Sequence, residues 1–241
     1  MTLLRERPDL WDTIFGNSLD RVHFIKKFMH TGEHILDVGC ATGSVCGLLR
    51  QRGARAVGID INPCFVAAAR TKDPSGEYHV GDMRNFRLRR KFDVLICIGT
   101  TFSYNLTNQD ILRTLLNFRA HLEPAGQVII DVLNAVAFIG PRPFQIRTEH
   151  KFARDGFHAT ATIRHGLDLK TQSMTEQVSW KIRGKRLRRD PEESLRLFFP
   201  QELRFYLEAA GFDAVKLMDG YRRISKDFSG RRLVAVAKKK S

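Results

Sequence analysis

The chain has 241 residues, and 43% of them are hydrophobic. That length suits one large domain, or one domain with an elaboration, and the apolar content excludes a disordered chain. No apolar run approaches the roughly 20 residues that a membrane-spanning helix needs. The charged segment from Met1 to Asp12 lacks the apolar core of a signal peptide. We therefore expect a cytoplasmic protein that does not associate with membranes.

The formal net charge of +14 is high. Basic residues gather at 84–91, 181–189 and 231–240, and such clusters are typical of nucleic-acid-binding surfaces. They show little sign of an aromatic platform on which bases stack. We therefore favour an ordinary basic surface and keep nucleic-acid binding as the alternative.

The cysteines show neither a C-x-x-C pair nor the histidine spacing of a zinc site. We expect four reduced thiols and no metal centre. The four are Cys40, Cys46, Cys64 and Cys97.

Residues 1–30 predict a helical cap. Apolar side chains recur at helical spacing in two runs, one containing Trp11 and Phe15 and the other extending from Val22 to Met29. The cap would precede the first strand of the core.

Residues 35–43, with the sequence ILDVGCATG, predict a buried strand that runs into a glycine-rich turn. A second apolar run, 56–59, ends at Asp60, about 20 residues after Gly39. Strand, glycine turn, helix, strand and acid form the layout of a doubly wound α/β fold that holds an adenosine-containing cofactor. The two carboxylate oxygens can accept hydrogen bonds from ribose hydroxyls. Alternatively, Asp60 caps a helix that begins at Pro63.

The turn carries Asp37-x-Gly39-x-x-x-Gly43 instead of the G-x-G-x-x-G that binds a dinucleotide pyrophosphate. An acid at this position repels pyrophosphate but can receive an ammonium group, which favours a cofactor with an amino-acid end. At these residues the chain resembles the class I S-adenosylmethionine-dependent methyltransferases. Their first motif is usually D/E-x-G-x-G-x-G, and Ala41 stands here in place of the middle glycine.

Later segments extend the resemblance. Residues 79–83 resemble the end of the third strand, where Asp82 would meet the adenine amino group and Met83 would pack on its ring. Residues 92–99 resemble the fourth strand, and residues 122–130 resemble a helix end, a turn and the fifth strand. The resemblance implies S-adenosyl-L-methionine as cofactor and S-adenosyl-L-homocysteine as its product. The implied cofactor contacts are Trp11, Asp37, Gly39, Cys40, Ala41, Gly43, Asp60, Ile61, Asp82, Met83, Ile98 and Gly99.

The resemblance also implies an α/β fold with a doubly wound, Rossmann-like, seven-stranded sheet. We expect an N-terminal helical lid at 1–30 and the cofactor-binding core at 31–135. An antiparallel β insertion at 136–199 would lie between core strands five and six, and 200–241 would complete the core and carry a basic tail. Core helices are expected near 44–52, 62–70 and 108–122.

Residues 136–199 change character after Pro141-Arg142-Pro143. Apolar and polar residues alternate at 157–163 and 175–183, which predicts antiparallel strands. We expect an insertion of three or so strands. A helix from Pro200 and a final hairpin of two strands would follow it.

Arg196-x-Phe198-x-Pro200, followed by Gly211-Phe212, narrows the resemblance to small-molecule methyltransferases. This C-terminal segment is similar to that of enzymes that methylate amino sugars, glycine-like amines and related metabolites. In that group the N-terminal segment folds over the cofactor, and the insertion roofs the acceptor pocket and often supports dimers. The resemblance implies methyl transfer to N or O of a small molecule, with a homodimer through the insertion.

Methyl transfer from a sulfonium mainly requires a dry pocket that aligns the nucleophile, the methyl carbon and the sulfur. Residues 99–105, after the fourth strand, lie where substrates bind in this fold. Phe102, Tyr104 and Phe15 are therefore candidates for the pocket wall, and Tyr104 is also a candidate catalytic residue.

A general base is needed only to leave an amine neutral or to assist a hydroxyl. His158 is our candidate catalytic base within the insertion, and His165 is a second candidate. Arg142, Arg147 and Arg164 are candidates for contacting a carboxylate or phosphate of the acceptor.

Two rival hypotheses stay open. Enzymes that methylate exocyclic base amines commonly carry (D/N/S)-P-P-(Y/F/W) after the fourth strand, whereas residues 98–101 are IGTT. An RNA methyltransferase of another type is supported by basicity alone. A catalytically silent S-adenosylmethionine-binding protein is the second rival, and the intact set of Asp37, Gly39, Asp60 and Asp82 argues against it.

Overall fold

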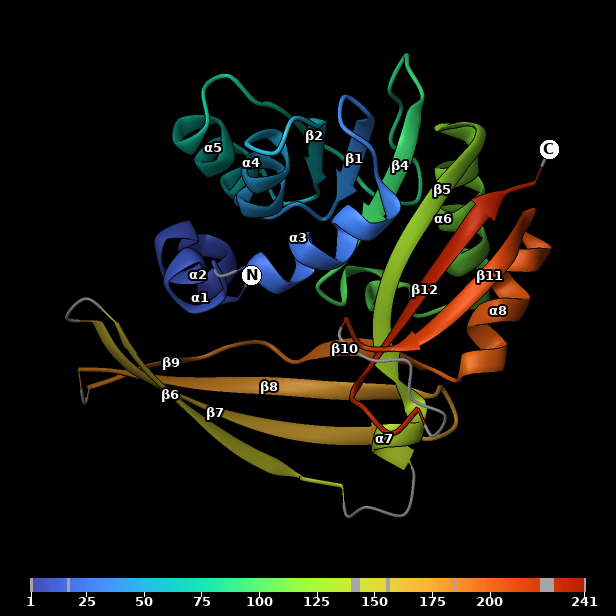
Figure 1. Cartoon of the computed structure of the whole chain (residues 1–241). Helices are drawn as coiled ribbons and strands as arrows, with labels where there is room; N and C mark the ends of the chain where they lie inside the picture. Colours follow the sequence, from blue (N-terminus) through green and yellow to red (C-terminus); the bar gives the residue numbers. More distant parts are fainter. Residues whose placement is uncertain are drawn as a thin grey trace.

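The computed structural model describes residues 2–16, 18–139, 144–154, 157–183, 185–221 and 228–240. Figure 1 shows an upper α/β layer and a second, more curved sheet beneath it, with the N-terminal helices between them. The break predicted at Pro141–Pro143 lies outside the described residues, and so does the candidate Arg142.

The upper layer contains a seven-stranded sheet in the order β3-β2-β1-β4-β5-β12-β11. The first five strands of this order are parallel, whereas β12 runs antiparallel to both of its neighbours. The doubly wound seven-stranded core predicted from the sequence is confirmed. Its strands are β1 (His34–Val38), β2 (Arg55–Asp60), β3 (Glu77–Val80), β4 (Phe92–Cys97), β5 (Leu122–Asn134), β11 (Phe212–Asp219) and β12 (Arg232–Lys239).

Helices cover both faces of this sheet because successive strand residues point to opposite sides. Leu36 and Leu95 join a core cluster with α6 and α8, whereas Ile35 and Ile96 join a second cluster with α3 and α4. The helices are α3 (Leu19–Ile25), η1 (Lys26–Phe28), α4 (Ser44–Arg50), α5 (Pro63–Lys72), η2 (Thr101–Tyr104), α6 (Asn108–Ala120) and α8 (Pro200–Ala209).

The helix starts follow local sequence signals. The Asn62 side chain accepts a hydrogen bond from the backbone N–H of Cys64 at 3.0 Å, and Pro63 occupies the first turn of α5. Thr107 caps α6 in the same way by accepting the N–H of Asp110 at 3.1 Å. These caps fix where each helix leaves the carboxyl edge of the sheet.

The insertion after β5 begins with α7 (Ala135–Ile139) and continues as a curved sheet, which we call the roof sheet (Figure 1). Among its described residues the roof sheet has five strands rather than three or so, because the Arg- and Lys-rich strands β6 and β9 lack an apolar alternation that predicts them. Strand β10 also pairs in parallel with the end of β5 and so joins the two layers. The strands are β6 (Arg147–Arg154), β7 (Phe157–Asp168), β8 (Ser173–Ile182), β9 (Lys185–Arg189) and β10 (Glu193–Phe198).

Helices α1 (Leu3–Glu6) and α2 (Pro8–Phe15) lie between α5 and the roof sheet (Figure 1). Their apolar residues Leu3, Leu4 and Leu10 pack against Ala161 and Trp180 of the roof. Within the described ranges, we find no helix with the length and apolar character needed to cross a membrane.

Candidate active site

The turn after β1 depends on left-handed backbone at alternate positions. Gly39 has a φ of +80° and Gly43 a φ of +76°, and Ala41 between them has a φ of +47°. A Cβ added to Gly43 would lie 2.7 Å from the Tyr78 hydroxyl, and one added to Gly39 would collide with Thr101. Both glycines are therefore required by conformation and by space.

The Asp60 carboxylate holds this turn and the segment that follows β2. Its Oδ2 accepts the backbone N–H of Ala41 at 2.8 Å, and its Oδ1 accepts that of Asn62 at 2.8 Å. Burial raises the pKa of Asp60 above its ordinary value, while these two hydrogen bonds act in the opposite direction. The helix cap is Asn62 and not Asp60, so the alternative capping role of Asp60 is wrong.

Apolar surface accompanies Asp60 at the carboxyl edge of the sheet. The Ile61 side chain is 60% exposed, and Val80 at the end of β3 is 55% exposed. By contrast, Cys40 is buried within the turn, and burial raises the pKa of its thiol well above the ordinary value. The surface at Ile61 can meet an aromatic ring, whereas Cys40 is a neutral packing residue.

Asp37 is buried at the end of β1, where the Cys46 thiol lies 3.6 Å from its Oδ2. Burial raises the pKa of Asp37 to about 7. Arg21 of α3 faces the same region. Burial and the nearby charge of Arg232 lower the pKa of Arg21 below its ordinary value, while Asp131 and Asp37 act in the opposite direction. A methyl carbon built on Gly99 would lie 3.6 Å from the Arg21 guanidinium. A carboxyl group and a guanidinium thus flank one end of the turn.

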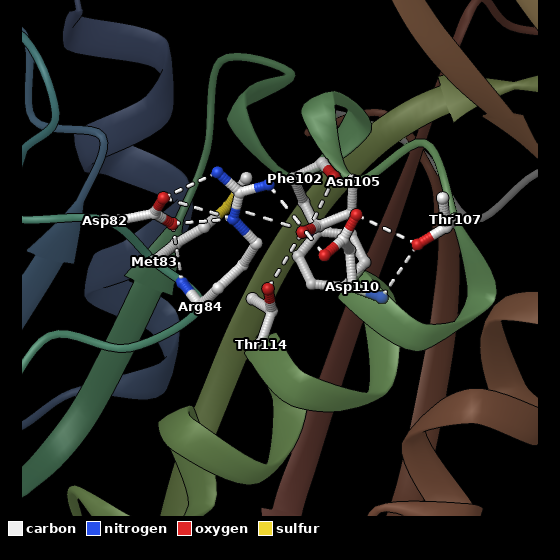
Figure 2. Close-up of polar contacts among 8 residues, drawn as sticks. All are labelled: Asp82, Met83, Arg84, Phe102, Asn105, Thr107, Asp110 and Thr114. Carbon is white, nitrogen blue, oxygen red and sulfur yellow. Dashed lines mark hydrogen bonds and ion pairs between the residues drawn. The ribbon is translucent and has the colours of Figure 1, made fainter.

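Asp82 is held by its neighbour Arg84, as Figure 2 shows. Arg84 donates from Nε at 2.9 Å and from Nη2 at 2.6 Å, and these hydrogen bonds hold the pKa of Asp82 below its ordinary value. Arg84 also lies 3.8 Å from Asp110 of α6. The Asp82 side chain, in the segment that follows β3, is therefore ionised and held in a fixed orientation by Arg84.

Met83 connects this segment to the loop after β4 (Figure 2). The Asn105 side-chain amide donates to the Phe102 carbonyl at 3.1 Å and lies 3.6 Å from the Met83 sulfur. Thr114 of α6 donates to Asn105 Oδ1 at 2.9 Å. The Phe102 ring is completely buried, 5.7 Å from the ring of Phe198, so it supports the loop from the core and does not line an open pocket.

Asp131 of β5 fixes the start of the same loop, and no sequence motif pointed to it. It is completely buried and accepts the backbone N–H groups of Gly99 and Thr100. Tyr221 also donates to it, and Arg232 lies 2.8 Å away. The buried Ile98 precedes this bend. The feature of the sequence that could have pointed to Asp131 is an acid within the apolar strand 128–132.

Tyr104 lies between the loop after β4 and the roof sheet. Its hydroxyl donates to Glu193 at 3.3 Å, and the Arg5 guanidinium lies 5.0 Å from its ring centroid. Desolvation, followed by the charge of Glu193, raises the pKa of Tyr104 to about 12, although 38% of the residue is exposed. At neutral pH it is a protonated hydroxyl that can donate or accept a hydrogen bond.

Trp11 of α2 packs between two aromatic rings, with centroids 4.8 Å from Phe15 and 4.9 Å from Phe65. Next to it, Asp12 pairs with Lys72 of α5 at 2.7 Å and accepts a hydrogen bond from Thr42 of the glycine turn. Helix α2 is therefore tied to the cofactor side of the site.

The two histidines of the insertion occupy different places. His158 is exposed at the distal end of β7, opposite Ala153 of β6, and is not brought together with the other candidates. His165 is buried further along β7 and faces Glu176 of β8. Arg147 and Arg164 pair in register on neighbouring strands.

The described residues contain no group of three or more His, Cys, Asp or Glu side chains arranged to hold a metal. All four cysteines are free, and only Cys64 is exposed.

Residues 35–126, which contain the turn, Asp60, Asp82 and the loop after β4, match the family model described as "Methyltransferase domain". The chain carries a methyltransferase domain. Its resemblance to class I S-adenosylmethionine-dependent methyltransferases, expected from the sequence, is confirmed.

This methyltransferase domain is similar to dTDP-4-amino-2,3,4,6-tetradeoxy-D-glucose N,N-dimethyltransferase of Saccharopolyspora spinosa, with 30% identity over 46% of this chain and 44% of that protein. It is also similar to dTDP-3-amino-3,4,6-trideoxy-alpha-D-glucopyranose N,N-dimethyltransferase of Streptomyces venezuelae, with 31% identity over 40% of this chain and 41% of that protein. The chain thus matches less than half the length of these curated relatives.

Solved structures share the fold over nearly the whole chain. An S-adenosylmethionine-dependent methyltransferase from Clostridium acetobutylicum superimposes with a TM-score of 0.80 at 17% identity, covering 97% of each chain. The sugar N-methyltransferase KedS8 from Streptoalloteichus superimposes with a TM-score of 0.79 at 18% identity, covering 100% of this chain and 94% of that one. At such identities the likeness shows a common fold, including the roof sheet.

Proposed function

We propose that the protein is an S-adenosylmethionine-dependent methyltransferase that methylates N or O of a small-molecule metabolite. The acceptor would be an amine, an amino sugar or a natural-product intermediate, in keeping with the sugar amines in the relatives' names. The observation that carries this proposal is Asp60, a buried carboxylate that two backbone N–H groups hold beside the glycine turn.

The residues present fit the cofactor at both of its ends. Asp60 can accept the ribose hydroxyls, and the exposed Ile61 offers an apolar face to adenine. At the other end, Asp37 can receive the ammonium group, and Arg21 can receive the carboxylate. Asp82 would meet the adenine amino group. A zwitterionic amino-acid group therefore has a partner for each of its charges.

S-adenosylmethionine, when bound, supplies a methyl group that is already activated by its sulfonium sulfur. The residues of the chain mainly have to orient the acceptor and exclude water. Asp131 fixes the loop that carries Tyr104, and the Tyr104 hydroxyl can orient the acceptor by a hydrogen bond. Trp11 and Phe15 lie on α2, which would close the site as a lid.

The basic surface supports the alternative function, RNA methylation. An open hollow between the segment after β3 and α6 is lined by Arg84, Arg87, Arg90, Lys91 and Arg113. Arg84 and Arg90 already pair with acidic side chains, which weakens the case for this alternative. We therefore keep the small-molecule acceptor as the proposal.

We also propose a cytoplasmic location, which the free cysteines support, and a homodimer through the roof sheet. In the part of the chain that the structure describes, strand β6 is an edge strand of that sheet and leaves backbone groups available for pairing with a second copy. Light scattering on the purified protein tests the dimer.

Calorimetry with S-adenosylhomocysteine and a methyl-transfer assay on a panel of dTDP-amino sugars test the proposed function. We expect micromolar product binding and turnover of at least one low-mass acceptor. Tight, salt-sensitive RNA binding without small-molecule turnover would favour the alternative. Binding of S-adenosylhomocysteine without small-molecule turnover and without RNA binding would indicate a catalytically silent protein.

A further inference from the structure

A line of polar side chains crosses the inner face of the roof sheet. It consists of Thr148 on β6, His165 on β7, Glu176 on β8 and Glu193 on β10, and we call it the polar line. His165 stands in register with Glu176, and Glu176 stands in register with Glu193. Side chains in register on neighbouring strands share a face, so three of these residues point to the same side.

Apolar clusters flank the polar line on both sides. Trp180, four residues after Glu176 on β8, packs against α1 and α2. Met174, two residues before Glu176, packs against Phe138 of α7. The face that carries Glu176 is therefore the face turned toward the helices and the core. On this face the polar line lies between two apolar contacts, one at Trp180 and one at Met174.

One end of the polar line is buried and incompletely paired. The Thr148 hydroxyl and His165 Nε2 lie 3.0 Å apart. The His165 side chain is only 5% exposed, and its Nδ1 lies 3.4 Å from Glu176 Oε1. Nδ1 nevertheless makes no hydrogen bond. A buried imidazole nitrogen thus lies beside the Glu176 carboxylate without a hydrogen bond of its own.

The other end is neutralised by the lid and the loop after β4. Arg5 of α1 pairs with Glu193 at 3.0 Å, and the Tyr104 hydroxyl donates to the same carboxylate. Among the described residues, the His165 imidazole is the only basic group within ion-pair distance of Glu176. The negative charge of Glu176 is therefore less well balanced than that of Glu193.

Glu176 lies beside the candidate active site. It stands in register with Glu193, whose carboxylate accepts a hydrogen bond from the Tyr104 hydroxyl at 3.3 Å, and Tyr104 belongs to the loop at the carboxyl ends of the parallel strands. The Glu176 side chain is 30% exposed, so a ligand can reach it.

We propose that Glu176 binds the protonated amine of the methyl acceptor and takes its proton, and that His165 positions the Glu176 carboxylate. This inference rests on the proposed function and makes an amine nitrogen, not a hydroxyl, the methylated atom. In the step, an N–H bond of the ammonium breaks and its electron pair stays on nitrogen. The proton forms an O–H bond with a Glu176 oxygen, and the neutral amine is left as the nucleophile.

The experiment measures acceptor binding in the presence of S-adenosylhomocysteine. The probes are dTDP-3-amino-3,4,6-trideoxy-alpha-D-glucopyranose, dTDP-4-amino-2,3,4,6-tetradeoxy-D-glucose and the hydroxyl counterpart of each. We expect the wild type to prefer at least one amine over its counterpart by tenfold or more. Glu176→Gln should lose at least tenfold of that preference, whereas Glu176→Asp, which keeps the charge, should retain most of it.

The control is Glu192→Gln, which removes the same charge from an exposed position beside β10 and should leave the preference unchanged. His165→Gln is expected to weaken amine binding threefold to tenfold and to leave hydroxyl binding unchanged, which a loss of folding would not do. Thermal unfolding of each variant checks its fold.

A wild type without amine preference, or a Glu176→Gln variant that keeps it, overturns this inference. The same titrations report the affinity for S-adenosylhomocysteine. If the wild type binds that compound normally but has no amine preference, only the inference fails. If it does not bind that compound, the proposed function fails as well.

Discussion

The buried Asp131 carboxylate accepts the backbone N–H of Gly99 at 2.9 Å. This bond, with a second from Thr100, fastens the loop after β4 to the neighbouring strand β5. Gly99 and Thr100 have φ angles of +78° and +66°, which most residues adopt only at a cost in energy. The hydrogen bonds to Asp131 stabilise this conformation, and the bend sets the position of Tyr104.

Asp131→Asn should therefore destabilise the protein. The amide nitrogen of Asn cannot accept the N–H of Gly99 or Thr100, so one buried donor loses its partner. We expect a loss of about 1–3 kcal/mol in the free energy of unfolding, measured with urea. Asp213→Asn changes an exposed acid on β11 and should have little effect. Equal stability of the two variants would rule out the role that we give to Asp131.

Asp60→Ala should weaken the binding of S-adenosylhomocysteine by about 1–3 kcal/mol, because charge-assisted hydrogen bonds to the ribose are lost. Calorimetry measures this change, and Asp213→Ala is the matched control. The variant also loses the contacts to Ala41 and Asn62, so its thermal unfolding must be recorded beside the affinity. An unchanged affinity in a folded variant would refute the ribose role.

The binding of S-adenosylhomocysteine should strengthen as the pH rises toward 7. Burial raises the pKa of Asp37 to about 7, so the carboxyl is largely neutral below that pH and cannot attract an ammonium group. We expect an increase in affinity of up to about tenfold per pH unit below pH 7 and a plateau above it. Asp37→Asn should flatten this dependence; a variant with the wild-type profile would show that another group is responsible.

The same carboxyl affects the stability of the free protein in the opposite direction. Its pKa is higher in the folded state than its ordinary value of 3.8. Its stabilising contribution is therefore complete below about pH 4 and is lost as the pH rises through 7. Urea unfolding of the wild type and Asp37→Asn between pH 4 and pH 8 should show this difference.

The sequence was informative where one short segment determines the local structure. The glycine turn and Asp60 were predictable because backbone conformation, spacing and apolar strands lie within one stretch of chain. Strands β6 and β9 were missed because strand pairing, and not an apolar alternation of their own, holds them in the roof sheet.

Side chains that act through distant partners were harder to find. Asp131 receives N–H groups from a loop some 30 residues earlier, and Arg21 reaches Gly99 only because α3 packs on the sheet. His158 and His165 were indistinguishable by composition. The register of β7 with β8 places His165, and not His158, opposite Glu176.

The N-terminal helices α1 and α2, which we propose to act as a lid, are held by different contacts on two sides, which makes their opening testable. On the roof side, Asp190 accepts the backbone N–H of Leu3 at 2.8 Å and the Trp180 indole N–H at 2.8 Å. On the core side, α2 is held by the pairing of Asp12 with Lys72 and by the packing of Trp11 on Phe65, while its Leu10 packs against Trp180 of the roof. Breaking the core-side pair should therefore loosen α2 while α1 stays docked.

Lys72→Met is expected to increase hydrogen exchange in α2 severalfold and to leave α1 close to the wild type, because the bond of Leu3 to Asp190 persists. Lys151→Met is the control, since the Lys151 side chain is 79% exposed on β6 and its ion-pair partner is Glu149 of the same strand. S-adenosylhomocysteine should slow exchange in α2 of the wild type, since Trp11 would then close over the bound nucleoside. If exchange rises equally in α1 and α2, the two helices move as one body, and the division of the lid into an anchored and a releasable part is wrong.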